Sequence, residues 1–326
     1  MDSAKSSMLE NAKTVKAVKK SKHFISSLVR ILFLLCVAYI VLYPLLYMVI
    51  SSISPKEALL NSRRIWIPNE VTFKFYGMVT EFMGYFKALG STLKYEIVAA
   101  FLEVCSCAVA AYGFSRFNFK GKKLFTGALF LTILIPTAMI IIPLSVNYSH
   151  LDVFGVLNLV YKITGVDIRP NILNTPLSFW LPSLLGIGLR SGIMIYIYIQ
   201  FFKGLPGEFE EAAYVDGAGP LRTFLQIIIP SSSVVILTVT VFSVIWHWND
   251  YQLAVMFMNN DLPLSVSLLN LPDLISVHGY WTTGGDPTAI SLLMAACVMF
   301  VLPPLIMYVF VQHWFIESVD RVGITG

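Results

Sequence analysis

Long apolar stretches alternate with short charged segments along this chain. Four stretches contain no charged residue: 31–55, 124–149, 223–249 and 287–316. Each exceeds the roughly 20 residues that a helix needs to cross about 30 Å of hydrocarbon. The composition agrees, because 56% of the residues are hydrophobic and 13% are charged, well below the charged share of a soluble domain. The pattern predicts an all-α integral membrane protein.

Six transmembrane helices account for this pattern. We predict them at 28–53, 91–114, 122–146, 181–202, 230–257 and 288–314. If the N-terminus lies inside the cell, the inner segments and the inner ends of the adjoining helices hold fourteen Lys and Arg, and the outer loops hold seven. Positive residues favour the cytoplasmic side of short loops. Both termini are therefore predicted to be cytoplasmic.

This topology divides the chain into successive segments. They are a basic cytoplasmic segment at 1–27, a first transmembrane helix at 28–53, an extracytoplasmic loop at 54–87, a core of five helices at 88–314 and a cytoplasmic tail at 315–326. The basic N-terminal segment adjoins a transmembrane helix, which favours anchoring at the bilayer over binding of nucleic acid.

A polar segment at 203–229, here called the coupling island, separates the fourth and fifth predicted helices. Pro206 suits a first helical position, and the acidic residues that follow it complement the positive end of a helix dipole. Gly217 stands where a left-handed helix cap is expected, and Pro220 can begin a second helix. The island is therefore predicted to be two short helices joined by a bend at the cytoplasmic surface.

The island has the composition of a docking helix. Ala212 and Ala213 are small enough for a partner to approach closely, and Glu211 can pair with a basic group on that partner. A helix that rests on lipid headgroups would instead carry Lys and Arg on its polar face. Binding of a soluble protein is therefore favoured over binding to lipid.

Three short motifs in and after the island resemble the permease motif of ABC importers. They are Glu211-Ala212-Ala213, Asp216-Gly217-Ala218 and Ile229-Pro230. The runs Gln200–Pro206, Trp248–Asp250 and Val319–Gly326 also resemble the carbohydrate branch of that family. The resemblance covers roughly residues 88–326. The whole pattern of this region is similar to that of a maltose-type sugar permease.

The resemblance implies a type I ABC-importer permease fold with a cytoplasmic coupling helix in a bacterial inner or plasma membrane. It implies three protein partners: a dimer of cytoplasmic ATPases, a second and often non-identical permease subunit, and an extracytoplasmic solute-binding protein. The ATPase would be contacted by Glu211, Ala212, Ala213, Asp216, Gly217 and Gly219. The chain has no phosphate-binding G-x-x-x-x-G-K-[ST] motif. We therefore expect ATP to be bound and hydrolysed by the partner, with no cofactor on this chain.

Charged and aromatic residues within the apolar segments are candidates for a substrate path. Glu103 and Arg190 lie inside predicted helices, where ionisable groups are usually functional. Two alternatives are that they neutralise each other across the bundle, or that Arg190 extends to the outer membrane interface. Trp246, Asn249 and Tyr251 combine ring faces with hydrogen-bonding groups and suit a sugar. The alternative for these three is an aromatic belt at the membrane interface. In a heterodimer the other subunit could supply most of the substrate contacts.

No catalytic or metal site is predicted. The four cysteines fall inside apolar segments, and none of His150, His247, His278 and His313 lies at ligand spacing from acids or cysteines. An intramembrane enzyme would also need a nucleophile or paired carboxylates. The chain is therefore expected to be a transport subunit, not an enzyme.

The sequence favours the permease of an ATP-driven, binding-protein-dependent importer for a sugar or oligosaccharide. One alternative is the same architecture with another small solute. The other is a secondary transporter driven by an ion gradient, which would predict two matching halves with broken helices. The sequence shows no such halves, and an ion-driven transporter leaves the acidic island unexplained.

Overall fold

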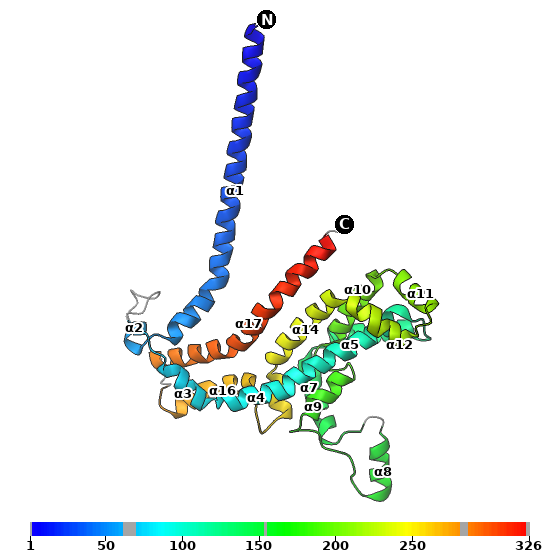
Figure 1. The fold of residues 1–326 in the computed structure, drawn as a ribbon. Helices are drawn as coiled ribbons and strands as arrows, with labels where there is room; N and C mark the ends of the chain where they lie inside the picture. Colours follow the sequence, from blue (N-terminus) through cyan, green and yellow to red (C-terminus); the bar gives the residue numbers. More distant parts are fainter. Residues whose placement is uncertain (1, 61–69, 153–154, 281–285, 324–326) are drawn as a thin grey trace.

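The structure is a computed structural model that describes residues 2–60, 70–152, 155–280 and 286–323, with side chains from residue 24 to residue 314 within those ranges. All regular elements in these ranges are helical, as the sequence predicts (Figure 1). The helices are α1 (Asp2–Ser52), α2 (Lys56–Leu60), α3 (Lys74–Phe82), α4 (Tyr85–Thr92), α5 (Val98–Arg116), α6 (Lys122–Leu134), α7 (Thr137–Ser149), α8 (Val156–Thr164), α9 (Leu177–Leu184), α10 (Ser191–Gly204), α11 (Glu208–Val215), α12 (Pro220–Thr223), α13 (Ile229–Ser231), α14 (Ser233–Trp248), α15 (Gln252–Phe257), α16 (Leu264–Val277) and α17 (Pro287–Gly323), with π-helical turns η1 (Leu93–Ile97) and η2 (Phe224–Ile228). Part of the predicted outer loop (61–69) and the end of the predicted tail (324–326) lie outside the described residues.

Three unbroken helices are long and apolar enough to cross a membrane. They span Phe24–Ser52, Tyr85–Arg116 and Pro287–Trp314. They correspond to the predicted helices at 28–53, 91–114 and 288–314. The second of them is a single run of α4, η1 and α5.

The other predicted helices are bent or divided. The predicted helix at 122–146 consists of α6 and α7, which meet at 104°. Ile135 is extended at this bend because the ring of Pro136 disfavours a helical conformation in the residue before it. The predicted helix at 230–257 is bent near its start, where the helical run Pro220–Ser231 meets α14 at 81°. It ends in the short α15, after residues 249–251.

The predicted helix at 181–202 requires the largest correction. It is divided into α9 and α10 by a non-helical stretch, Leu185–Arg190. Gly186, at a φ of 69°, supplies the left-handed turn that ends α9. If each bent pair counts as one crossing, the described residues contain up to five helices that pass by length and composition. The count of six remains a prediction.

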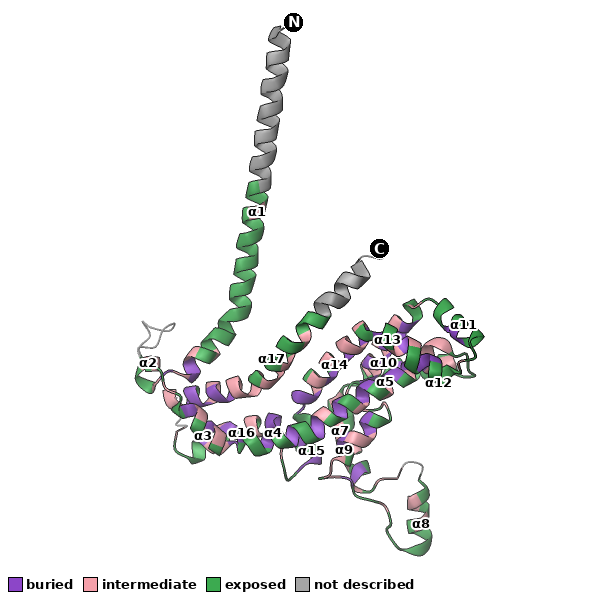
Figure 2. Ribbon diagram, viewed as in Figure 1, coloured by how far each residue is buried: buried purple, intermediate pink, exposed green. Residues whose placement is uncertain are grey.

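The first helix stands apart from the rest of the fold. α1 extends away from the bundle and contacts α17 near its own C-terminal end (Figure 1). Phe24, Phe33 and Ile40 are 69%, 66% and 70% exposed, and green covers most of the described face of α1 in Figure 2. An apolar helix with so little protein cover is suited to hydrocarbon.

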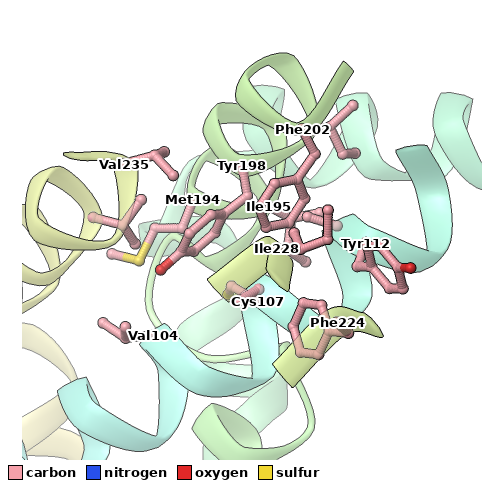
Figure 3. Close-up of a cluster of buried hydrophobic side chains, with 14 of the residues drawn as sticks. Val104, Cys107, Tyr112, Met194, Ile195, Tyr198, Phe202, Phe224, Ile228 and Val235 are labelled. Atoms are coloured by element: carbon pink, nitrogen blue, oxygen red, sulfur yellow. The ribbon is translucent and has the colours of Figure 1, made fainter. Parts of the chain in front are cut away.

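The main apolar core lies where α5, α10 and α14 pack together with η2 (Figure 3). Tyr198 and Phe202 of α10 stack with ring centroids 5.6 Å apart, and Cys107 of α5 is fully buried beside them. α6 approaches α10 so closely that a Cβ on Gly192 would collide with the hydroxyl of Thr132. Small residues at such crossings let membrane helices approach each other and gain dispersion energy.

Candidate functional site

The coupling island folds as α11 and a second helical run that begins with α12 and continues through η2 into α13, with a bend between them, as the sequence predicts. α11 ends in a Schellman motif. The Ala218 amide donates to the Ala213 carbonyl at 2.9 Å, and the Gly217 amide donates to the Tyr214 carbonyl at 3.0 Å. Gly217 has a φ of 78°, the left-handed conformation that this cap requires.

Most residues of the predicted docking set lie on the surface of the island. Glu211, Ala212, Asp216, Gly217 and Gly219 are exposed, whereas Ala213 is buried. Ala213 therefore packs inward, beneath the surface that a partner could reach.

Large apolar side chains are exposed on the same small helices. Val215 is 88% exposed and Leu221 71%. The island therefore presents an acidic surface with apolar side chains beside it, which suits a protein groove.

Arg116, the last residue of α5, ties the island to the membrane helices. Its guanidinium donates to the Leu205 carbonyl at 3.0 Å. Its Nε also lies 3.1 Å from Glu210 Oε1 on α11. The two atoms form an ion pair, and neither of them makes a hydrogen bond. Both side chains are mostly buried, at 16% and 11% exposure, so solvent screens the pair less than a surface pair.

A buried polar cluster lies further along α5. Glu103 accepts hydrogen bonds from Ser191 at 2.5 Å and from Ser243 at 2.9 Å. His247 of α14 lies between two carboxylates, with Nε2 at 3.2 Å from Glu103 and Nδ1 at 3.0 Å from Glu96. Neither glutamate is exposed to solvent. An imidazolium would donate to both carboxylates in this arrangement, and the cluster thereby joins η1, α5, α10 and α14.

The sequence did not reveal this cluster, because Glu96 and His247 are 151 residues apart. The glutamates themselves gave a signal, since positions 96 and 103 are seven apart and share one face of a continuous helix. The suggested pairing of Glu103 with Arg190 is wrong, because Glu103 contacts His247 and two serines instead. Within the described residues, no group of three or more His, Cys, Asp or Glu side chains is arranged to hold a metal ion.

A cavity of about 700 Å³ lies beside this cluster, between the bent pair α6–α7 and the helices α9, α10, α14 and α15. Arg190 and Trp246 both line it, and the guanidinium carbon is 4.9 Å from the Trp246 ring centroid. His247 reaches the same wall. The cavity therefore lies next to the polar cluster.

The structure brings together some of the predicted substrate residues and not others. Arg190 and Trp246 share the cavity wall. Glu103 lies behind the wall, in contact with His247. Asn249 and Tyr251 are exposed residues outside the lining, and the Asn249 amide donates to the Ile245 carbonyl of its own helix at 2.7 Å.

Comparisons with known proteins agree with this architecture. The family described as "Binding-protein-dependent transport system inner membrane component" matches residues 105–321. Among curated proteins, the chain is 28% identical over 210 residues to the sn-glycerol-3-phosphate transport system permease protein UgpE of Yersinia pestis, a match that covers 64% of each chain. It is also 26% identical over 262 residues to the alpha-glucoside transport system permease protein AglG of Rhizobium meliloti, covering 79% of this chain and 62% of that one.

A solved structure shares the fold. It is the crystal structure of a bacterial ABC transporter involved in the import of the acidic polysaccharide alginate, with a TM-score of 0.68, 23% identity and coverage of 89% of this chain and 96% of that chain. The family match alone extends over most of the chain, from the middle of α5 to α17. This chain belongs to the family of inner membrane components of binding-protein-dependent transport systems.

Proposed function

We propose that this chain is the transmembrane permease subunit of an ATP-driven, binding-protein-dependent importer for a sugar or oligosaccharide. The observation that carries this proposal is the coupling island: an exposed, acidic, rigidly capped helix that Arg116 connects to α5. A docking helix needs an accessible surface and a firm connection to the part that it moves. The island has both.

The proposed partners follow from the division of labour in the family. A cytoplasmic ATPase dimer would contact Glu211, Ala212, Asp216, Gly217 and Gly219, while buried Ala213 would support α11 from within. A second permease would complete the path, and a soluble binding protein would deliver the substrate from outside. ATP hydrolysis would then take place entirely on the partner chains.

The membrane topology and the division of the chain are part of the proposal. Both termini would be cytoplasmic, in agreement with the distribution of Lys and Arg. The segment 88–314 would form the transport core, with α1 as a separate first helix. α1 leaves its apolar face uncovered by this chain over its described side chains, which suits contact with lipid or the second permease.

A sugar is the proposed class of substrate. AglG is named for alpha-glucoside transport, and the structural neighbour for import of a polysaccharide. In this chain, the cavity combines apolar walls with Arg190, Trp246 and Gln252. Aromatic faces and hydrogen-bonding groups together suit saccharides, which present both apolar faces and hydroxyls.

The coupling proposal can be tested in the complete transporter, reconstituted with its partner permease, ATPase and binding protein. We expect Glu211→Ala and Gly217→Pro to lower ATP-dependent uptake by roughly tenfold, the effect of about 1.4 kcal/mol of lost docking energy. Membrane insertion should be unchanged. Glu57→Ala is the control, because Glu57 is an exposed acid on the predicted outer side. Normal uptake and ATPase binding in both island variants would refute the assignment, and uptake without ATP would favour the ion-driven alternative.

A further inference from the structure

Arg190 is a permanent charge in the middle of a membrane helix region. It directly precedes α10, whose 14 residues extend about 21 Å from the cytoplasmic island at 1.5 Å per residue. Ionisable side chains at such a depth are costly and usually mark a functional path. None of the described carboxylates lies within ion-pair distance, 4.0 Å, of its guanidinium. Asp250 interacts with Arg190 electrostatically but without ion-pair contact.

The backbone of Arg190 has a left-handed conformation, which is strained for an arginine. Its φ is 58°, a left-handed conformation that is uncommon for residues other than Gly, Asn and Asp. Arg190 also precedes the N-terminus of α10, where a positive charge opposes the helix dipole. Strain of this kind persists at functional sites, where the surrounding structure imposes it.

Trp246 holds the Arg190 side chain in one orientation. The guanidinium lies over the indole at 4.9 Å, and Phe242 stacks with the indole at 5.5 Å and an interplanar angle of 19°. A guanidinium carries its N–H donors in its own plane. Stacking on Trp246 therefore leaves these donors free, and no hydrogen bond to an acceptor within the described residues engages them.

The side chains that line the cavity beside Arg190 favour an anion. Among the residues that line it, none is an aspartate or a glutamate. His247 also reaches the wall, but two buried carboxylates already face its ring. Ser183 is 1% exposed, and its hydroxyl has no hydrogen-bond partner among the described residues. The wall therefore combines one cation that has no ion-pair partner within 4.0 Å among the described residues with an unused hydroxyl.

We propose that Arg190 is a specificity-determining residue for a saccharide that carries a carboxylate or phosphate group. Its planar N–H donors match the paired oxygens of such an anion and form two parallel hydrogen bonds with it. Trp246 acts as a positioning residue that aims the guanidinium. This inference rests on the proposed function and narrows its substrate class from saccharides to anionic saccharides.

The test uses the complete transporter in proteoliposomes with saccharides of matched length: neutral, uronate-containing and phosphorylated. We expect the wild-type protein to import an anionic saccharide in preference to the neutral one. Comparison of the two anionic probes shows whether Arg190 recognises a carboxylate or a phosphate. Arg190→Gln should lower uptake of the preferred anionic saccharide by roughly 10- to 150-fold, the range for lost hydrogen bonds to a charged group. Arg190→Lys keeps the charge but loses the paired donors, and should recover only part of that loss.

Lys94 provides a matched control, because its ammonium also lies over an aromatic ring, that of Tyr95 at 5.1 Å, but away from the cavity. Lys94→Gln should leave uptake of every probe within about twofold of wild type. Trp246→Leu should raise the KM for the anionic saccharide by a larger factor than the KM for any imported neutral saccharide, a difference that general loss of structure would not produce.

Three outcomes would overturn the proposal: wild-type preference for the neutral probe, unchanged anionic uptake in Arg190→Gln, or equal losses for neutral and anionic probes. The last result would make Arg190 a structural residue. Failure of the proposed function would look different, because no saccharide of any charge would then be imported.

Discussion

Gly217 ends α11 in a left-handed conformation, with a φ of 78°. Gly207, at the other end of the same helix, has a φ of −66°. A Cβ built at either glycine would meet no atom within 4 Å. Alanine substitutions at the two positions therefore differ in backbone conformation and not in steric contact. The pair isolates the contribution of the Schellman cap.

We expect Gly217→Ala to destabilise the island by about 1–2 kcal/mol, the cost of a left-handed conformation for a residue with a Cβ. That cost lowers the population of the capped island by roughly 5- to 30-fold relative to its open form. Gly207→Ala has no such strain, and alanine there restricts the unfolded chain, which stabilises by about 0.4–1 kcal/mol. The two variants should therefore differ in opposite directions from wild type.

Amide hydrogen exchange of α11 in the purified complete transporter measures this difference. Exchange in Glu208–Val215 should speed up by roughly 5- to 30-fold in Gly217→Ala, and stay equal or slow down in Gly207→Ala. ATP-dependent uptake should fall only in the first variant. Equal exchange in the two variants would refute the reasoning, because the left-handed cap would then contribute nothing to the stability of the island.

Three further predictions concern the contacts around the helices. His247→Ala should lower the Tm of the assembled transporter by the equivalent of about 3–5 kcal/mol, because it leaves two buried carboxylates without their shared donor; the exposed His150→Ala is its control, and equal Tm values would contradict a structural role for the cluster. Arg116→Ala should speed hydrogen exchange of α11 by the equivalent of about 1–3 kcal/mol, because it removes the 3.0 Å hydrogen bond to the island, and unchanged exchange would show that the island is held by other contacts. In the predicted outer loop, Arg169 holds the pKa of Asp167 well below the usual range, so the pairing is present above the ordinary aspartate range and is lost only as the pH falls through the lowered pKa. Loop exchange, corrected for its intrinsic pH dependence, should therefore stay constant from about pH 7 to pH 5 and rise at both pH values in Asp167→Asn, whereas a rise in the wild type by pH 5 would count against the pairing.

Local signals were sufficient to predict much of the fold. The cap at Gly217 follows from an Asp-Gly pair at the end of an amphipathic acidic helix, and the structure has that cap. Two of the three unbroken helices, those of α1 and α17, follow from uncharged runs longer than a bilayer is thick. Each of these features depends on residues close together in the sequence, so a single sequence contains the necessary information.

The divided helix and the polar cluster depend on tertiary contacts. The stretch 181–202 is apolar enough to be one helix, and the break at Gly186 to Arg190 forms because this segment packs against other parts of the fold. A Cβ on Gly188 would lie 2.8 Å from the Ser183 hydroxyl and 3.1 Å from Glu103. The position of His247 between two glutamates likewise depends on how α14 packs against α5. The hydrophobic pattern of the sequence therefore predicts neither contact.

The link at Arg116 has a mechanical consequence for the whole chain. Arg116 and Glu103 lie on one uninterrupted helix, thirteen residues or about 20 Å apart at 1.5 Å per residue. A hydrogen-bonded helix in a close-packed interior resists compression. We therefore expect α5 to transmit motion as a rigid body. A displacement of the island at one end of α5 should move the polar cluster, beside the cavity, by nearly the same distance.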